Sequence, residues 1–202
     1  MTFDEFVEFE RTSNVKHEIW DGVLVAMAGA KEEHNDVAGN VFGSLHNAYR
    51  AGGCKPYGSD QMVHAASLDK GFYPDVSAVC GPREFRDPED RRVLLNPTLV
   101  VEVLSQSTAS RDMTQKLDAY LSMPSVEQCV IIDPSTLYVR VYTRRPTGWL
   151  MQTLTDADDT LDLTSVNAKL TMAEIYFGVT VGETSTVRET DIGESLDELT
   201  SS

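Results

Sequence analysis

The sequence has no long apolar run. Hydrophobic residues make up 41% of its 202 residues. However, Asp, Glu, Arg or Gly interrupts each run before it reaches the ~18 residues that a membrane-spanning helix needs. The chain starts Met-Thr-Phe-Asp-Glu, which is acidic and lacks the basic and apolar regions of a signal peptide. We therefore expect no membrane contact and a cytoplasmic location.

Cysteine is scarce. Cys54, Cys80 and Cys129 are odd in number, far apart, and form no Cys-x-x-Cys pair. This spacing argues against a disulfide framework and against a zinc-finger type of site. It predicts reduced, mostly buried thiols.

Basic residues are also few, with 17 Lys and Arg against 32 Asp and Glu, for a formal net charge of −15. A protein with a broad phosphate-binding surface would normally be basic. Contact with nucleic acid therefore requires a local patch, and eight arginines are candidates: Arg83, Arg86, Arg91, Arg92, Arg111, Arg140, Arg144 and Arg145. The alternative for the first four is a solvated loop in which they pair with Glu84, Asp87, Glu89 and Asp90.

The length predicts a single domain over residues 1–180. Residues 181–202 are expected to form a flexible acidic tail, because the last twenty residues hold six acids, one basic residue and no aromatic residue.

Apolar periodicity predicts an α/β fold with a mixed central sheet flanked by helices. An N-terminal helix capped by Thr2 and a β-hairpin around Asp21-Gly22 come first. Further helices are expected over Glu33–Arg50, through Met113–Leu121 with caps at Ser107, Thr108 or Ser110, and over Leu170–Phe177. Strands are expected at Lys55–Ala65, around Asp75, and at Leu99–Leu104, Cys129–Ile132, Leu137–Tyr142 and Trp149–Leu154. Gly39 and Gly43 lie four residues apart, which suggests close packing of their helix against another element.

Two of the apolar strands each carry one carboxylate, Asp75 and Glu102. A buried charge costs several kcal/mol unless it is paired or bound to a metal. The helix that follows the Glu102 strand carries Lys116. Two carboxylates suit Mg²⁺ or Mn²⁺, which can lower the pKa of a bound water, and a nearby ammonium can orient that water. The pattern indicates a metal-assisted hydrolase acting on phosphodiesters.

These residues resemble the Uma2 family of the PD-(D/E)XK nuclease superfamily. The resemblance rests on Pro74-Asp75-Val76, on Leu99 to Ser105, on Asp112 and Lys116 before Tyr120, and on Val130 to Pro134. Glu18 to Gly22 and His34 match the N-terminal pattern of the family, and the likeness extends from Phe3 to Tyr176.

The resemblance implies a restriction endonuclease-like core in which Asp75 and Glu102 bind the metal and Lys116 is the catalytic lysine. Leu104 stands where the superfamily usually has that lysine, so Lys116 would supply it from the next helix. Glu18 and His34 are further candidates for catalytic residues. The alternative for Glu18 is an exposed position in the hairpin, and the alternative for His34 is an ordinary neighbour of a helix cap. Asp133 fits a turn residue better, and Tyr120 a core residue; Lys116 could instead pair with Asp112.

The sequence therefore predicts a metal-dependent endonuclease whose candidate substrate is nucleic acid, with DNA as the first candidate. A homodimer is expected by analogy with the fold of other nucleases. A catalytically inactive nuclease fold that serves as a binding or regulatory module is the alternative. A small phosphorylated substrate is a third possibility, which suits the negative charge.

Overall fold

The structure of the protein is a computed structural model that describes residues 1–105 and 111–182. Side chains of residues 111–113 are outside this description. The predicted helix caps Ser107, Thr108 and Ser110, and nearly all of the predicted tail, lie outside the described residues. No helix in the described part of the chain is long and apolar enough to cross a membrane.

A six-stranded sheet forms the centre of the fold, in the order β11-β10-β9-β8-β6-β3. Only β8 and β9 are parallel, and the chain crosses between them through helix α3 (Arg111–Ser122). The other neighbouring strands are antiparallel. The strands are β3 (Lys55–Gly58), β6 (Val76–Val79), β8 (Leu99–Val103), β9 (Gln128–Asp133), β10 (Tyr138–Arg145) and β11 (Gly148–Leu154). Strand β8 is buried at all five positions, as expected for a central strand covered on both faces.

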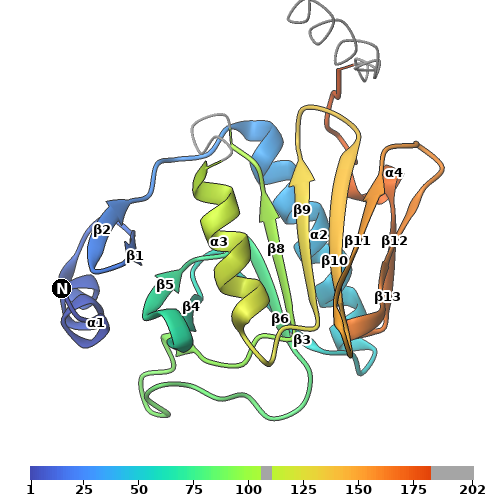
Figure 1. The fold of residues 1–202 in the computed structure, drawn as a ribbon. Coiled ribbons are helices and arrows are strands. Elements are labelled where there is room, and N and C mark those ends of the chain that lie inside the picture. Colours follow the sequence, from blue (N-terminus) through green and yellow to red (C-terminus); the bar gives the residue numbers. More distant parts are fainter. Residues whose placement is uncertain (106–110, 183–202) are drawn as a thin grey trace, which may run out of the picture.

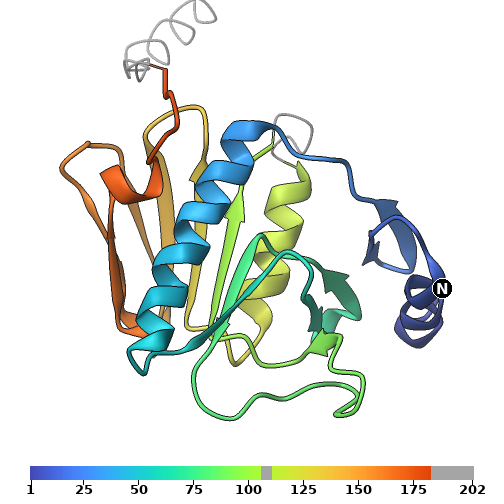
Figure 2. The same ribbon diagram turned by 180° about the vertical axis from the view of Figure 1, so that it is seen from behind.

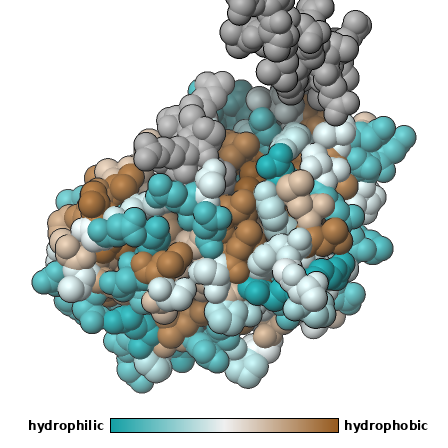
Figure 3. All heavy atoms as spheres, in the orientation of Figure 1, coloured by the Kyte–Doolittle hydropathy of each residue, from teal (hydrophilic) through white to brown (hydrophobic). Residues whose placement is uncertain are grey.

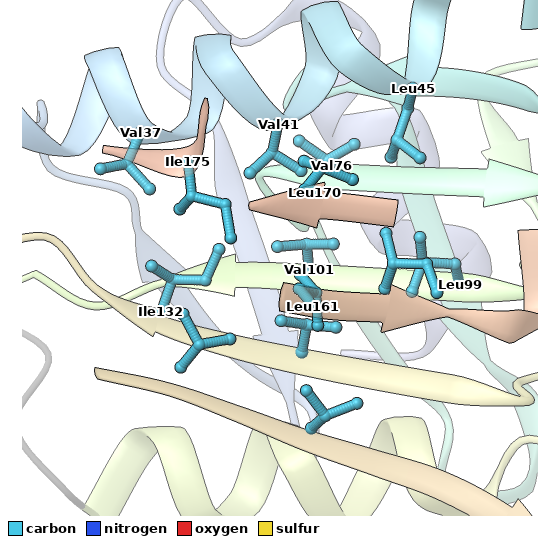
Figure 4. Close-up of a cluster of buried hydrophobic side chains, with 14 of the residues drawn as sticks. Val37, Val41, Leu45, Val76, Leu99, Val101, Ile132, Leu161, Leu170 and Ile175 are labelled. Carbon is cyan, nitrogen blue, oxygen red and sulfur yellow. The ribbon is translucent and has the colours of Figure 1, made fainter. Parts of the chain in front are cut away.

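Helix α2 (Glu32–Arg50) covers one face of this sheet, together with the hairpin β12 (Thr160–Leu163) and β13 (Ala168–Thr171), the short helix α4 (Met172–Ile175) and a 3-10 turn at Thr164–Val166 (Figures 1 and 2). Val37, Val41 and Leu45 recur at helical spacing on α2 and pack on the sheet. Figure 4 shows these side chains converging with those of Val76, Leu99, Val101, Ile132, Leu161, Leu170 and Ile175 in the main core.

Helix α3 and a second sheet lie against the opposite face. This sheet has the order β2-β1-β5-β4-β7. Its strands are β1 (His17–Trp20), β2 (Val23–Ala26), β4 (Met62–Ala65), β5 (Lys70–Phe72) and β7 (Val93–Leu94), with a 3-10 turn at Ala66–Leu68. Helix α1 (Phe3–Thr12) packs on it through Phe3 and Phe6. A buried cluster that includes Phe72, Val100 and Tyr120 joins the second sheet, the central sheet and α3.

The N-terminal expectations are confirmed. Thr2 caps α1 in a capping box with Glu5. Asp21 and Gly22 have φ values of 48° and 82°, and these left-handed conformations allow the two-residue turn between β1 and β2.

Three predictions about elements are wrong. The strand expected over Lys55–Ala65 is two strands, β3 and β4, which belong to different sheets. The helix expected over Leu170–Phe177 is the end of β13 followed by the single turn of α4, because capping at Thr171 starts the helix only at Met172. A side chain at Gly39 or Gly43 would meet nothing within 4 Å, so these glycines mark no close packing.

The cysteine prediction is also wrong for two of the three thiols. Cys54 and Cys80 form a disulfide, whereas Cys129 is free and buried. Lys55 pairs with Val79 across β3 and β6, which places the two cysteines opposite each other at the ends of these strands. Strand register, which is not visible in the spacing, brings them together.

Candidate active site

Asp75, the residue just before β6, lies beside Glu102 of the neighbouring strand β8. Val76 of β6 pairs with Val101 of β8 in an antiparallel ladder, so the next pair in register is Asp75 and Glu102. The backbone N–H of Val103 donates to Oδ2 of Asp75 at 2.8 Å and fixes this carboxylate just before the start of β6. The sequence-predicted pair of acids is therefore brought together.

Glu18 reaches the same place from the second sheet. It lies on β1 and is only 4% exposed, so the exposed-hairpin alternative does not hold. Its Oε2 accepts a hydrogen bond from Nε1 of Trp20 at 3.3 Å, and its Oε1 accepts one from the backbone N–H of Tyr73 at 3.4 Å. Three carboxylates, from β1, from β8 and from the residue before β6, thus converge where the two sheets meet.

Lys116 of α3 lies among these acids. Its Nζ is 2.6 Å from Oε1 of Glu18 and 3.6 Å from Oε1 of Glu102. Burial disfavours the ammonium, but the charges of Glu102 and Glu18 outweigh burial and raise the pKa of Lys116 above its ordinary value. Lys116 is therefore a protonated, buried cation. The side chain of Asp112, its alternative partner, lies outside the described residues.

Tyr120, which the sequence places in the core, is also part of the site. It is fully buried, and its hydroxyl donates to Oε1 of Glu102 at 2.6 Å. Burial raises the pKa of Glu102 to about 7, with Lys116 opposing the shift and the charges of Asp75 and Glu18 adding to it. The i+4 spacing of Lys116 and Tyr120 on α3 was the available signal, because it places both side chains on one helix face.

His34 approaches Asp75 from the first turn of α2. Its Nε2 is 3.3 Å from Oδ2 of Asp75. Burial lowers the pKa of His34, but the hydrogen bond and charge of Asp75 outweigh burial and give a net rise. Its Nδ1 is buried and has no partner within the described residues. The structure thus brings all five predicted site residues together, while their roles stay predictions.

The donor set suits a metal ion held by two carboxylates and water. Across residues 1–105 and 111–182, no group of three or more His, Cys, Asp or Glu side chains is arranged to hold one ion together. Within the described chain, Oδ1 of Asp75 and Oε2 of Glu102 accept no hydrogen bond, so each carboxylate has an oxygen for a ligand. Mg²⁺ commonly binds one or two protein carboxylates and keeps several waters. Glu18 and Glu102 are buried and Asp75 is partly buried beside Lys116 and His34, so a bound cation would offset carboxylate charge here.

Other predicted residues do not join the site. Oδ1 of Asp133 accepts hydrogen bonds from the backbone N–H and hydroxyl of Ser135, which is turn chemistry, as expected. In the loop after β6, Arg86 pairs with Asp4, and Arg92 pairs with Asp90. Arg92 therefore follows the alternative of a loop ion pair, whereas Arg86 pairs with an acid of α1 that was not among the expected partners.

Comparison with known proteins identifies the family and the fold. An uncharacterised protein of Synechocystis sp., slr1290, is 28% identical over 177 residues, covering 87% of this chain and 91% of its own. A second, sll1609, is 28% identical over 144 residues, covering 71% and 81%. The crystal structure of a "putative nuclease belonging to DUF820" from Anabaena variabilis superposes with a TM-score of 0.73 at 16% identity, covering 87% of this chain and 97% of the other. The fold is therefore restriction endonuclease-like. The profile of the Uma2 family, described as "Putative restriction endonuclease", matches residues 3–173, so the chain belongs to the Uma2 family.

Proposed function

We propose that the protein is a metal-dependent nuclease that hydrolyses phosphodiester bonds of nucleic acid, with DNA as the first candidate substrate. Asp75 and Glu102 would hold Mg²⁺ or Mn²⁺. The observation that carries the proposal is a pair of neighbouring carboxylates, Glu102 buried and Asp75 partly buried, with Nζ of the largely buried Lys116 3.6 Å from Glu102. Membership of a family described as nucleases supports the same reaction.

A bound divalent ion would lower the pKa of a coordinated water and offset charge on the scissile phosphate. Hydrogen bonds within the protein orient the two carboxylates that would bind this ion. The N–H of Val103 orients Asp75, and the hydroxyl of Tyr120 orients Glu102. The carboxyl pKa of about 7 means that Glu102 gives up a proton readily when a cation arrives near neutral pH.

Lys116 acts as a positive charge and hydrogen-bond donor. Its raised pKa keeps the proton on Nζ, so it would orient a water or phosphate oxygen and would not remove a proton. Glu18 fixes the position of that ammonium at 2.6 Å. His34, beside Asp75, would hold a proton at the opposite edge of the site.

Calorimetric titration with Mg²⁺ and Mn²⁺ tests the metal site, and cleavage of single- and double-stranded oligonucleotides tests the reaction. We expect saturable binding that Asp75→Ala and Glu102→Ala each abolish. The matched control is Asp133→Ala, which removes an acid engaged in a turn and should leave metal binding intact. Equal metal binding and equal cleavage by parent, Asp75→Ala and Glu102→Ala would refute the proposal.

A catalytically inactive binding module is the second candidate. Leu104, in place of the usual lysine, and the net charge of −15 favour it. Turnover that depends on Lys116 would exclude this candidate, whereas metal binding without cleavage of any nucleic acid would favour it. The homodimer and the cytoplasmic location stay predictions, and sedimentation velocity tests the first.

A further inference from the structure

Strands β10 and β11 present one face of the central sheet on the same side as α3. In this ladder Tyr142 pairs with Met151 and Arg144 with Trp149, and paired residues point to the same face. Tyr142 and Trp149 pack against the buried cluster that contains Tyr120 of α3, which identifies the face. We call this surface the β10–β11 face; its members are Tyr138, Arg140, Tyr142, Arg144, Trp149 and Met151.

The β10–β11 face is open. Helix α3 packs over β9 and the second sheet, and among the described residues no helix lies in front of β10 or β11 (Figure 1). In the same orientation a band of apolar surface runs down the middle of the molecule beside the position of α3, and the surface over β10 and β11, to its right, is mostly neutral to polar (Figure 3). The rings of Tyr138, Tyr142 and Trp149 are partly exposed, and Met151 is 53% exposed.

The charge of this hairpin is opposite to that of the protein. Residues 134–155 contain Arg140, Arg144 and Arg145 and no acidic residue, whereas the whole chain has a net charge of −15. Arg86 and Arg92 of the loop after β6 pair with acids, but the hairpin has no acid of its own. An acid-free basic segment on an acidic protein is complementary to a polyanion.

Aromatic rings and guanidinium groups alternate on the face. The Arg140 guanidinium lies 5.4 Å from the ring centroid of Tyr138, and that of Arg144 lies 4.3 Å from the Trp149 ring. Arg144 is fixed because it donates to the carbonyls of Leu121, Met123 and Val126 at the end of α3. The guanidinium of Arg140 donates to the hydroxyl of Tyr138, while its Nε is buried and has no partner in the described part of the chain. No acidic residue of the hairpin pairs with Arg140, so its positive charge is available to a phosphate.

The face is also continuous with the candidate active site. Glu102 of β8 pairs with Ile131 of β9, which in turn pairs with Arg140 of β10. These three residues form one row across the sheet and point to the same face. Since neighbouring strands are about 4.8 Å apart, Arg140 is roughly 10 Å from Glu102. A strand bound on the face would lead toward the carboxylates.

We infer that the β10–β11 face binds single-stranded nucleic acid, with bases stacked on its exposed rings and a phosphate at Arg140. This inference rests on the proposed nuclease function and specifies the form of its substrate. Base stacking on aromatic side chains requires unpaired bases, which a duplex does not offer on a flat face. A second copy of the chain fits less well, because two such faces packed together would place their arginines against one another.

The test compares two neighbouring residues of one exposed strand. Met151→Glu places a negative charge on the face. Leu150→Glu adds the same charge to the same strand, but Leu150 pairs with Thr143 and points to the opposite side. The two side chains are similarly exposed, at 53% and 42%, so both variants should fold. Arg140→Ala and Arg140→Lys form a second pair that removes or keeps the charge at Arg140.

The probe is a fluorescein-labelled 20-nucleotide oligothymidylate, with the dT·dA duplex for comparison, and binding is measured by anisotropy in EDTA so that no cleavage occurs. We expect Met151→Glu and Arg140→Ala to weaken binding of the single strand by about tenfold or more. Leu150→Glu and Arg140→Lys should stay within about threefold of the parent. The salt dependence of log K for Arg140→Ala should be shallower by about 0.7.

The outcomes separate this inference from the proposed function. The inference is wrong if Met151→Glu and Leu150→Glu bind the single strand with equal affinity. It is also wrong if the parent protein binds the duplex as tightly as the single strand. Either result would overturn it even if the protein cleaves nucleic acid in Mg²⁺. Weakened binding in Met151→Glu without any cleavage by the parent would support the binding face and refute the nuclease. If sedimentation shows that Met151→Glu only dissociates a dimer and leaves oligonucleotide affinity unchanged, the face is a subunit interface and the inference is wrong.

Discussion

Replacing Lys116 by Met should destabilise the metal-free protein strongly. The side chain keeps a similar length, but the ammonium 2.6 Å from Glu18 and 3.6 Å from Glu102 is lost, and both carboxylates stay buried. Removing one partner of a buried ion pair costs about 3–5 kcal/mol, because the remaining charge has no compensation. For a domain of this size, that loss lowers the melting temperature by about 10 °C. Urea unfolding in EDTA at about pH 8, where the carboxyl groups are largely ionised, measures it directly.

A double-mutant cycle separates the ion pair from packing. Glu18→Gln removes one of the two acids, so the second substitution should cost less in the Lys116→Met background, with a coupling of about 1–3 kcal/mol. Lys169→Met is the control, because Lys169 is 71% exposed in its pair with Asp162 and should cost less than about 1 kcal/mol. The reasoning fails if Lys116→Met costs no more than this control, or if the cycle is additive within about 0.5 kcal/mol.

Three further predictions concern other buried groups. Tyr120→Phe leaves Glu102 without a 2.6 Å hydrogen bond and should cost about 1–3 kcal/mol in urea unfolding, whereas no change would mean that water replaces the hydroxyl. Burial and a neighbouring arginine lower the pKa of His64 below its ordinary 6.5 in the folded state, so its contribution to stability is present above that pH and is lost as pH falls below it. His64→Phe should therefore flatten the decline of stability toward about pH 5, and an unchanged slope would contradict this assignment. Replacing Cys54 and Cys80 by Ser opens a cross-link that spans 26 residues, which should cost up to about 3.5 kcal/mol, and reductant should have no further effect on that variant.

The local elements could be predicted from the sequence because their signals are local. The capping box at Thr2, the Asp21-Gly22 turn and the apolar stripe of α2 each act within a few residues, and each formed as expected. The wrong predictions concern features that depend on how distant parts of the chain pack together. Residues 55–65 read as one strand, yet a turn after Gly58 sends the second half into another sheet.

The candidate active site also combines features that are visible in the sequence with features that depend on the folded structure. Asp75 and Glu102 stand out because a charge within an apolar strand requires an explanation, and Lys116 follows on the next helix. Glu18 could not be separated from an exposed hairpin residue, since its burial depends on the docking of two sheets. Tyr120 was assigned to the core from its helical spacing, which is correct but omits the bond to Glu102 that only the folded geometry reveals.

Glu18 lies on the second sheet, whereas Glu102 lies on the central sheet, and this separation affects when the candidate active site can form during synthesis of the chain. Its ammonium partner lies 98 positions later in the chain, so their contact has a high sequence separation. Such contacts form late because loop closure must precede them. The lysine therefore acquires its fixed position only when the N-terminal hairpin, the central strands and α3 have all assembled. A nascent or partly unfolded chain would lack an ordered reaction centre, which confines any hydrolysis to the completed fold.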